Sequence, residues 1–395
     1  MVVRIGIVGT GYVADNYMQS FATFPDVEIC AVTDIDKVRR ERFGAYWRVP
    51  PVDDLDALTT LIGQGGLILN LTNPSAHFDV SRQCLEAGLN VYSEKPLALY
   101  LDDARQLCDL AAARGLLIAA APCNFLGEAA QVLATAVRAE VAGRPRLVYA
   151  EIDDDFVSQA PHALWTTPSG TPWPFEDEFQ VGCTIEHAGY YLTWLVAMFG
   201  SVRNVVAASA CLAPDRMRVS NPAPDLSVAM LFFESGVVAR LTCSILAPHN
   251  HTIVVVGDHG ILEVDDCWDN SARVRFRRRF VFRRKLLTSP FSRRMKLRGE
   301  THPKTKRVGA SSMNFALGPL DLVEAIEVGR KPRMSAELAL HLTEVTMAIA
   351  GAGESAGIRT MSTRCPPIAP MPWALELKGA SRWQMEPAVA ASGEA

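Results

Sequence analysis

Short apolar runs alternate with amphipathic stretches along the first third of the chain. The apolar runs predict buried strands, and the stretches between them have the spacing of helices. We expect strands at residues 2–8, 27–33, 67–71, 90–93 and 116–121. We expect helices up to Phe21, at 75–87 with Ser75 as its cap, and at 102–114. This alternation is typical of a doubly wound parallel sheet, and we place that first domain at residues 1–122.

From residue 123 the pattern changes to neighbouring strands separated by short turns. We expect strands at 147–152, 202–209, 227–233, 237–244, 251–257 and 260–264. We expect helices at 128–141, up to Phe199, at 320–328 and at 336–350, the last capped by Ser335 and packed against the first domain. Tight turns between strands predict a large, mostly antiparallel open sheet in an α+β domain at residues 123–378. Residues 379–395 are expected to form a flexible tail.

Residues 153–180 are expected to form a long loop rich in Pro, Trp and acidic residues. A loop of this length inside a compact domain is usually functional or disordered. Trp165 and Trp173, with His162 and Asp177 nearby, form either a sugar-stacking lid or an anchor on the core. The sequence leaves both interpretations open.

A glycine-rich turn follows the first strand and opens the first helix. Gly9 allows the tight turn, Gly11 lets the backbone approach a pyrophosphate, and Ala14 lets the helix pack close to the strand. The free N–H groups and positive dipole at the helix N-terminus attract phosphate. The sequence therefore predicts a dinucleotide site that includes Gly9, Thr10, Gly11, Tyr12 and Val13.

An acidic residue, Asp34, ends the second strand, where a dinucleotide-binding fold holds the adenosine ribose hydroxyls. Asp36 follows closely, and an NADP site usually needs a basic residue there instead of carboxylates. The two acids therefore favour NAD over NADP. Asp34 could also cap the next helix, and both roles could hold together.

Two further strand ends carry polar residues. Thr72, Asn73 and Pro74 follow the third strand, with His77 in the first turn of the next helix, and Glu94-Lys95-Pro96 follows the fourth. Because the carboxyl ends of parallel strands meet at one crevice, we expect both segments to face the ligand. Pro96 biases the backbone of Lys95 towards an extended conformation, which would fix the orientation of the lysine. Taken alone, His77 could be structural and the second segment a solvated turn.

The GTGYVA, TNPxxH and EKP segments together resemble the Gfo/Idh/MocA family of oxidoreductases, which includes glucose–fructose oxidoreductase, inositol dehydrogenase and dihydrodiol dehydrogenase. The resemblance implies an NAD(P)-dependent dehydrogenase or reductase of a sugar, cyclitol or nucleotide-linked sugar. It implies that Lys95 is catalytic and that Glu94 helps to shape the nicotinamide pocket. It also implies that the open sheet covers the cofactor, and we expect a homo-oligomer, dimer or tetramer, formed through the open sheet face.

The family carries an acid, a glycine two residues later and a His or Tyr four residues after the acid. Counting back from Gly200 assigns these positions to Glu186, Ala188 and Tyr190, so Glu replaces the usual Asp and Ala the usual Gly. Glu186 would orient the substrate or the lysine. Tyr190 is our preferred proton carrier, and His187 is the alternative if the register shifts. We expect Lys95 near Tyr190 to lower the pKa of both groups. A helix whose tyrosines only pack in the core also remains open.

Composition limits the class of protein. The chain has 395 residues, 49% of them hydrophobic, and no apolar run near the ~18 residues of a membrane helix. Its nine cysteines lack the spacing of a metal or redox motif, so no metal site is predicted. Scattered cysteines, and a first segment that reads as a strand and phosphate loop instead of a signal peptide, predict a cytoplasmic protein.

The net charge of −4 conceals one basic block. Residues 271–298 contain twelve Lys or Arg and no acid, which leaves 27 basic and 43 acidic residues, a net −16, in the rest of the chain. The block reads as an exposed strand or as a patch for an anionic substrate, partner or membrane. With no recognised nucleic-acid motif, we expect no nucleic-acid partner. The alternative to an enzyme is a non-catalytic NAD(P)-binding sensor or scaffold that uses this block to bind an anionic partner.

Overall fold

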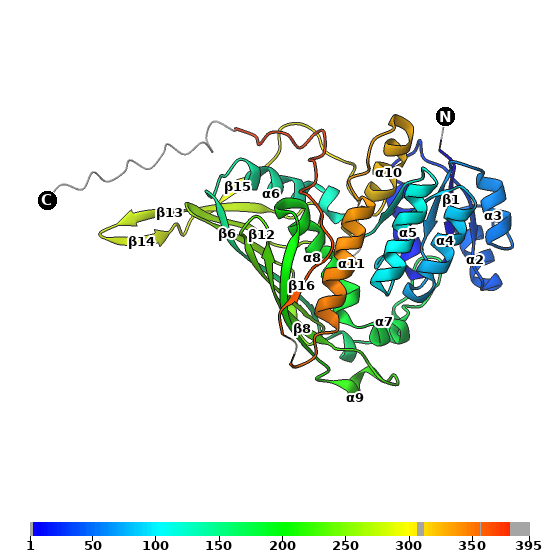
Figure 1. Cartoon of the computed structure of the whole chain (residues 1–395), viewed down its shortest axis with the longest axis horizontal. Coiled ribbons are helices and arrows are strands. Elements are labelled where there is room, and N and C mark those ends of the chain that lie inside the picture. The colour runs from blue at the N-terminus through cyan, green and yellow to red at the C-terminus, as the bar shows by residue number, and fades with distance from the viewer. Residues whose placement is uncertain (1–2, 306–311, 356, 380–395) are drawn as a thin grey trace.

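Two sheets with helices between them make up the protein (Figure 1). The computed structural model describes residues 3–305, 312–355 and 357–379. Helices α8 (Cys183–Phe199) and α11 (Ala336–Ala350) separate the N-terminal sheet from the larger second sheet. A parallel sheet followed by a mostly antiparallel one confirms the predicted fold class.

The first sheet is parallel throughout, with the strand order β2-β1-β3-β4-β5. Every residue of β1 and β3 is buried, as expected for strands covered on both faces. Its strands are β1 (Ile5–Val8), β2 (Ile29–Thr33), β3 (Leu67–Asn70), β4 (Asn90–Ser93) and β5 (Ile118–Ala120). Its helices are α1 (Tyr12–Phe21), α2 (Lys37–Trp47), α3 (Leu55–Ile62), η1 (Pro74–Ala76), α4 (His77–Glu86) and α5 (Leu101–Ala113).

The second sheet has the order β14-β13-β12-β11-β6-β9-β8-β7-β16, with β10 beside β6 and β15 beside β13. All described pairings are antiparallel except that of β6 with β9. Its longer strands are β6 (Pro145–Asp155), β7 (Val202–Ala210), β8 (Leu226–Phe233), β9 (Val238–Ser244), β11 (Ile253–Gly257), β12 (Gly260–Val264) and β13 (Val274–Phe282). Its shorter strands are β10 (Ala247–Asn250), β14 (Lys285–Thr288), β15 (Arg293–Met295) and β16 (Arg359–Thr360).

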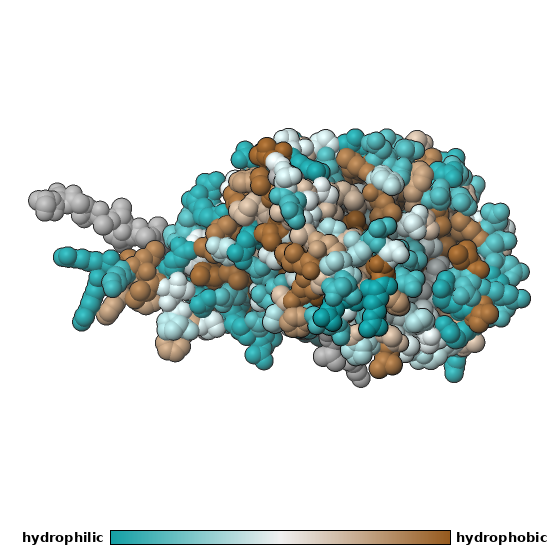
Figure 2. All heavy atoms as spheres, turned by 90° about the horizontal axis from the view of Figure 1, so that it is seen from below, coloured by the Kyte–Doolittle hydropathy of each residue, from teal (hydrophilic) through white to brown (hydrophobic). Residues whose placement is uncertain are grey.

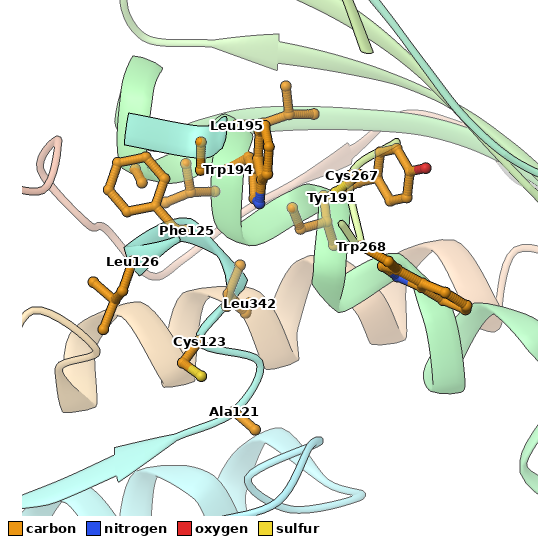
Figure 3. Packing of buried hydrophobic residues seen from close by; sticks show 14 of the residues in the cluster. Ala121, Cys123, Phe125, Leu126, Tyr191, Trp194, Leu195, Cys267, Trp268 and Leu342 are labelled. Carbon is orange, nitrogen blue, oxygen red and sulfur yellow. The ribbon is translucent and has the colours of Figure 1, made fainter. Parts of the chain in front are cut away.

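The remaining helices belong to the second part of the chain, and some of them form the layer between the two sheets. They are η2 (Asn124–Leu126), α6 (Glu128–Arg138), η3 (Val157–Gln159), η4 (His162–Leu164), α7 (Phe175–Val181), α8, α9 (Pro214–Met217), α10 (Leu317–Val328) and α11. Figure 3 shows Trp194 and Leu195 of α8 beside Phe125 of η2, directly after the last strand of the first sheet. The Sγ of Cys108 on α5 lies 3.7 Å from the carbonyl oxygen of Ala336, so α11 packs on the first domain as predicted.

Several predicted boundaries and caps are wrong. Pro74 starts the 3-10 turn η1, so Ser75 does not cap α4, which begins at His77 without a side-chain cap. Residues 251–257 do not form one strand, because β10 ends at Asn250 and β11 starts at Ile253. Residues 153–180 contain η3, η4 and α7 and are not a continuous loop.

The basic block forms strands β13, β14 and β15, and the β13–β14 hairpin projects from the sheet (Figure 1). Figure 2 shows apolar atoms at its base and hydrophilic atoms at its tip. Arg275 and Arg277 are paired with Asp265 and Glu263 on the neighbouring strand and turn. These two of the twelve basic residues are therefore neutralised, and Arg283, Arg284 and Lys285 lie at the turn of the hairpin.

The proposed boundary near residue 122 lies between β5, which ends at Ala120, and η2. The predicted tail, residues 379–395, lies outside the described residues except for Gly379. No described helix has both the length and the apolar character needed to cross a membrane.

Candidate active site

The glycine-rich turn leaves the start of α1 open. Gly9 has φ +90°, and a Cβ there would lie 2.6 Å from the Leu71 carbonyl oxygen, so a side chain does not fit. Gly11 precedes α1, whose first turn has no side-chain cap, and a Cβ on Gly11 would meet nothing within 4 Å. Free N–H groups beside open space suit a phosphate.

The carboxylate of Asp34 is held from several sides. It accepts hydrogen bonds from the Thr10 N–H and hydroxyl at 2.7 and 2.9 Å and from the Asp36 N–H at 2.9 Å. The Arg39 guanidinium donates to both oxygens, at 3.0 and 2.7 Å. Burial acts to raise the pKa of Asp34, but Arg39 and these hydrogen bonds outweigh it and lower the pKa. Asp36, instead of Asp34, caps α2 through the N–H of Arg39.

Two strand ends of the first sheet are fastened together by His77. Its fully buried ring lies 2.6 Å from the Pro96 carbonyl oxygen through Nδ1 and 2.9 Å from the Thr72 carbonyl oxygen through Nε2. Glu94 accepts a hydrogen bond from the Tyr17 hydroxyl at 2.6 Å and from the Lys95 N–H at 3.1 Å. The segments after β3 and β4 are therefore fixed relative to each other.

Lys95 reaches across to the second domain and contacts the carboxylate of Glu186 on α8. Burial acts to lower the pKa of Lys95, but Glu186 and the other nearby acids outweigh it, so the pKa is raised. Glu178 of α7 is hydrogen-bonded to Glu186, and burial together with the Glu186 charge raises the pKa of Glu178 well above its usual range. A charged lysine and a second carboxyl group, whose pKa is raised, thus flank the Glu186 carboxylate.

Tyr190 lies one turn after Glu186, with its ring centroid 6.0 Å from Lys95 Nζ. Burial raises the pKa of Tyr190, although Lys95 acts in the opposite direction. The prediction that Lys95 and Tyr190 lower each other's pKa is therefore wrong. Tyr190 acts to raise the pKa of Lys95, and burial together with the nearby acids outweighs the lowering effect of Lys95 on the pKa of Tyr190. His187 also faces the site, with Nε2 3.9 Å from an Asp154 oxygen, and burial lowers its pKa to about 3.

A strap, residues 165–177, runs along the mouth of the site. Ser169 donates hydrogen bonds from its N–H (3.1 Å) and hydroxyl (2.7 Å) to Asp15 of α1, and Asn73 donates to Asp177 at 2.6 Å. Trp165 and Trp173 lie side by side with ring centroids 5.1 Å apart. The tryptophans join an aromatic cluster with His162, in line with the anchor interpretation, and they also line the cavity, so the sugar-stacking lid stays a prediction.

A cavity of about 310 Å³ connects these groups. Of the predicted site residues it brings together Gly11, Tyr12, Val13, Thr72, Asn73, Pro74, His77, Glu94, Lys95, Glu186, His187 and Tyr190. Gly9, Thr10 and Asp34 do not line it and instead support the loop from behind or beside it. The sequence analysis missed Glu178, Asp154 and Trp268 in the walls, and Arg39 beside Asp34. Only Arg39 carried a sequence signal, a basic residue five positions after Asp34.

The residues present fit a dinucleotide. The open backbone at Gly11, the uncapped start of α1 and a cavity that continues from there to Lys95 supply the phosphate donors and a pocket for the reactive ring. Pro74 and Glu94 contribute to the same wall.

Comparison with known proteins gives matches over most of the chain. Residues 3–121 match a family model described as an oxidoreductase family with an NAD-binding Rossmann fold, and residues 130–263 match the GFO/IDH/MocA C-terminal domain. A trans-1,2-dihydrobenzene-1,2-diol dehydrogenase of Sus scrofa is 23% identical over 279 residues, 68% of this chain and 76% of its own length.

Two solved structures share the fold. The WlbA dehydrogenase from Bordetella pertussis, in complex with NADH and UDP-GlcNAcA, has a TM-score of 0.69 at 18% identity, covering 91% of this chain and 99% of its own. A 3-ketoreductase from Actinomadura kijaniata, in complex with TDP-benzene and NADP, has a TM-score of 0.68 at 18% identity, covering 90% and 98%.

Proposed function

Because the chain belongs to the Gfo/Idh/MocA family of NAD(P)-binding oxidoreductases, we propose that it catalyses hydride transfer between NAD and a carbinol or carbonyl carbon of a sugar-like substrate. The observation that carries the proposal is the meeting of Lys95 from the first domain with Glu186 and Tyr190 from the second in one cavity. When bound, the nicotinamide accepts or supplies the hydride.

The first domain would hold the dinucleotide. Gly9, Gly11 and the N–H groups at Tyr12 and Val13 would bind the pyrophosphate at the start of α1. Thr72, Asn73, Pro74 and Glu94 would form the wall beside the nicotinamide, and His77 and Thr10 would position these segments.

We propose NAD as the preferred cofactor, with NADP used less well. Thr10 and Asp36 fix the carboxylate of Asp34, whereas the side chain of Arg39 is one-third exposed and free to give way to ribose hydroxyls. A 2′-phosphate would gain Arg39 but would meet the Asp34 carboxylate, a like charge.

Lys95 would stabilise the alkoxide that develops as the carbinol carbon loses its hydride. Glu186 supports this role because it keeps the ammonium charged and points it across the cavity. Tyr190 would take the hydroxyl proton during oxidation and return it during reduction. His187, on the same helix, is the second candidate for this proton.

The charge of the cavity favours a neutral, polyhydroxylated substrate. Five acids line it, namely Glu94, Asp154, Asp177, Glu178 and Glu186, against one lysine. Such a wall offers acceptors to several hydroxyl groups and disfavours a substrate that carries phosphates of its own. Trp165, Trp173 and Trp268 add aromatic faces on which a sugar or cyclitol ring could stack. We therefore favour a sugar or cyclitol over a nucleotide-linked sugar.

Turnover and cofactor binding together test the proposal. The protein is incubated with NAD and a panel of neutral sugars, cyclitols and nucleotide-linked sugars at alkaline pH, and NADH absorbance is recorded. We expect turnover with neutral polyols. Lys95→Ala should keep its NAD affinity by titration calorimetry but lose roughly 10²- to 10⁴-fold in kcat. NAD binding without turnover across the panel would favour the sensor function, and an unchanged kcat in Lys95→Ala would exclude the assigned role.

We further propose a homo-oligomer formed through the open face of the large sheet. Alternate residues of β11 and β12, among them Val254, Val256 and Ile261, are only partly buried, so one face of the sheet, with apolar side chains at its centre, has no covering layer within the described chain. Sedimentation equilibrium measures the subunit number, and a monomer at micromolar concentration would contradict this arrangement. All nine cysteines are free, which supports the proposal of a reducing, cytoplasmic location.

A further inference from the structure

A second group of polar side chains lies behind the wall of the catalytic cavity. Asp154, at the end of β6, lines the cavity with one side and meets His251 with the other. His249 joins them, and one ligand-type atom from each of the three residues lies within 4.8 Å of the others. Neither the family models nor the cysteine pattern assigns a role to this group.

His251 is buried without a hydrogen bond. Its side chain is 1% exposed, yet neither ring nitrogen has a hydrogen-bond partner among the described residues. Nε2 lies 3.6 Å from an Asp154 oxygen and Nδ1 lies 3.7 Å from an Asp266 oxygen, both too long for hydrogen bonds. Leaving buried polar atoms unpaired is destabilising, so the arrangement calls for a partner.

The local fold brings the donors together. Strand β10 pairs with the end of β6, placing Asn250 opposite Asp153, and the His249 N–H donates to an Asp155 oxygen at 3.0 Å. The rings of His249 and His251 lie 4.0 Å apart, and Trp268 packs on His251 with ring centroids 4.4 Å apart. Trp268 also lines the cavity, so the indole and Asp154 lie between the two histidines of the cluster and the catalytic groups.

We propose that Asp154, His249 and His251 bind one divalent transition-metal ion of the zinc type, with Asp266 beside them. Two imidazole nitrogens and a carboxylate oxygen form a donor set that zinc and its neighbours prefer, and a fourth position remains for water or a hydroxyl group. Two ligand atoms on one tetrahedral zinc ion lie about 3.3 Å apart, close to the His251–Asp154 separation. The ion fixes the position of Asp154 and, through it, the cavity wall beside His187.

Metal titration tests this site directly. Untagged protein is dialysed against a chelator and titrated with Zn²⁺ by calorimetry and with Co²⁺ by visible absorption. We expect one ion per chain at micromolar or tighter Kd, a Co²⁺ spectrum of mixed nitrogen and oxygen ligation, and a rise in Tm on adding Zn²⁺.

Matched variants locate the ion. His251→Asn should weaken binding at least tenfold, and His249→Ala, whose side chain is half-exposed, should do the same without disturbing the core. His259→Ala, an exposed histidine on the turn between β11 and β12, should bind the ion as the unmodified chain does. No binding at millimolar Co²⁺ would overturn the proposal. Unchanged binding in His249→Ala, or equal loss in His259→Ala, would also overturn it.

Discussion

The charge on Lys95 depends on a carboxylate from the other domain. Glu186 contacts the ammonium group, and Glu178, whose carboxyl pKa is raised, is hydrogen-bonded to Glu186. The acids keep the lysine charged in a buried site, where an isolated ammonium would lose its proton. Tyr190, whose ring centroid lies 6.0 Å from the charged lysine, is the proposed proton carrier.

The pH profile of turnover reports on Tyr190. Because its pKa is raised, the phenolate fraction should increase about tenfold per pH unit from pH 7 to pH 10, and kcat/KM for alcohol oxidation should follow. The acids Glu94, Glu178 and Glu186 act to raise the pKa of the phenol, and Lys95 opposes them.

Tyr190→Phe should abolish that slope and lower kcat by roughly 10²- to 10⁴-fold. Tyr191→Phe is the matched control, because the buried Tyr191 hydroxyl has no hydrogen-bond partner among the described residues. If kcat/KM of the wild-type enzyme does not change with pH, or if Tyr190→Phe keeps the slope, we would assign the proton-carrying role to His187.

Cofactor choice depends on the pair formed by Asp34 and Arg39. Asp34→Ser should remove the carboxylate that repels a 2′-phosphate and should release Arg39 to bind it, raising the NADP-to-NAD ratio of kcat/KM at least tenfold. The double variant with Arg39→Ala should reverse the gain, and Asp36→Ser should leave the ratio near its original value. Steady-state kinetics with both cofactors decides, and an unchanged ratio in Asp34→Ser would contradict the assignment.

At the residue scale, the sequence predicted the groups whose positions follow from strand ends or from a short motif. Lys95 and the residues at 72–74 lie at carboxyl ends of parallel strands, so topology alone brings them to one crevice. Glu178 could not be found this way, because it meets Glu186 only when the short helix α7 folds against α8. The sign of the Tyr190 shift was also out of reach, since it depends on how deeply the phenol is buried.

Among the elements, α11 is tied to both the large sheet and the C-terminal segment by one imidazole. His341 Nε2 accepts a hydrogen bond from the Val202 N–H at 2.9 Å, so its proton is on Nδ1, which lies 2.7 Å from the Thr363 hydroxyl. Thr363 in turn donates to Glu344. This series of hydrogen bonds requires a neutral imidazole ring, and burial lowers the pKa of His341 to about 4.

Stability should therefore fall in mild acid. A histidine whose folded pKa lies below its unfolded value of ~6.5 contributes its full stability above that value and loses it as the pH falls towards the folded pKa. Between pH 7 and pH 5 the loss from His341 is about 2 kcal/mol. His341→Gln, which keeps an acceptor for Val202, should reduce the pH dependence of the unfolding free energy by that amount in urea titrations. His259→Gln, at an exposed site, should not change it, and equal slopes in all three proteins would exclude the mechanism.

Elements with strong periodicity were predictable, and those held by tertiary contacts were not. Strand β4 and helix α11 have the predicted bounds, because apolar alternation and the Ser335 cap are local signals. The strap and α7 carry no such period, and they take their shape from contacts with Asp15 and Asn73, more than 90 residues away in the sequence. The strand expected at 251–257 does not begin at residue 251, because the chain bends between β10 and β11, where the two histidines lie.

On the scale of the whole molecule, two domains contribute to one cavity, and neither holds the complete constellation. The N-terminal sheet supplies the phosphate loop and Lys95, and the layer between the sheets supplies α8. Helix α11 and η2 fasten that layer to the first domain (Figures 1 and 3). The relative position of the domains therefore sets the distance between the lysine and the tyrosine.

The strap that joins Asp15 and Asn73 to the second domain also sets a sequence of events in time. Because it lies over the start of α1, a dinucleotide and a sugar cannot both exchange freely while it stays fastened, so the cofactor should enter first and leave last. We expect opening of the strap to limit the rate, so kcat should fall as solvent viscosity rises.

The variant Ser169→Ala, which loses one hydrogen bond to Asp15, tests this order. Its viscosity effect should weaken while the KM for cofactor increases, whereas Ser235→Ala on a distant turn should behave as the parent. If kcat of the parent enzyme does not depend on viscosity, the chemical step, and not product release, limits the rate.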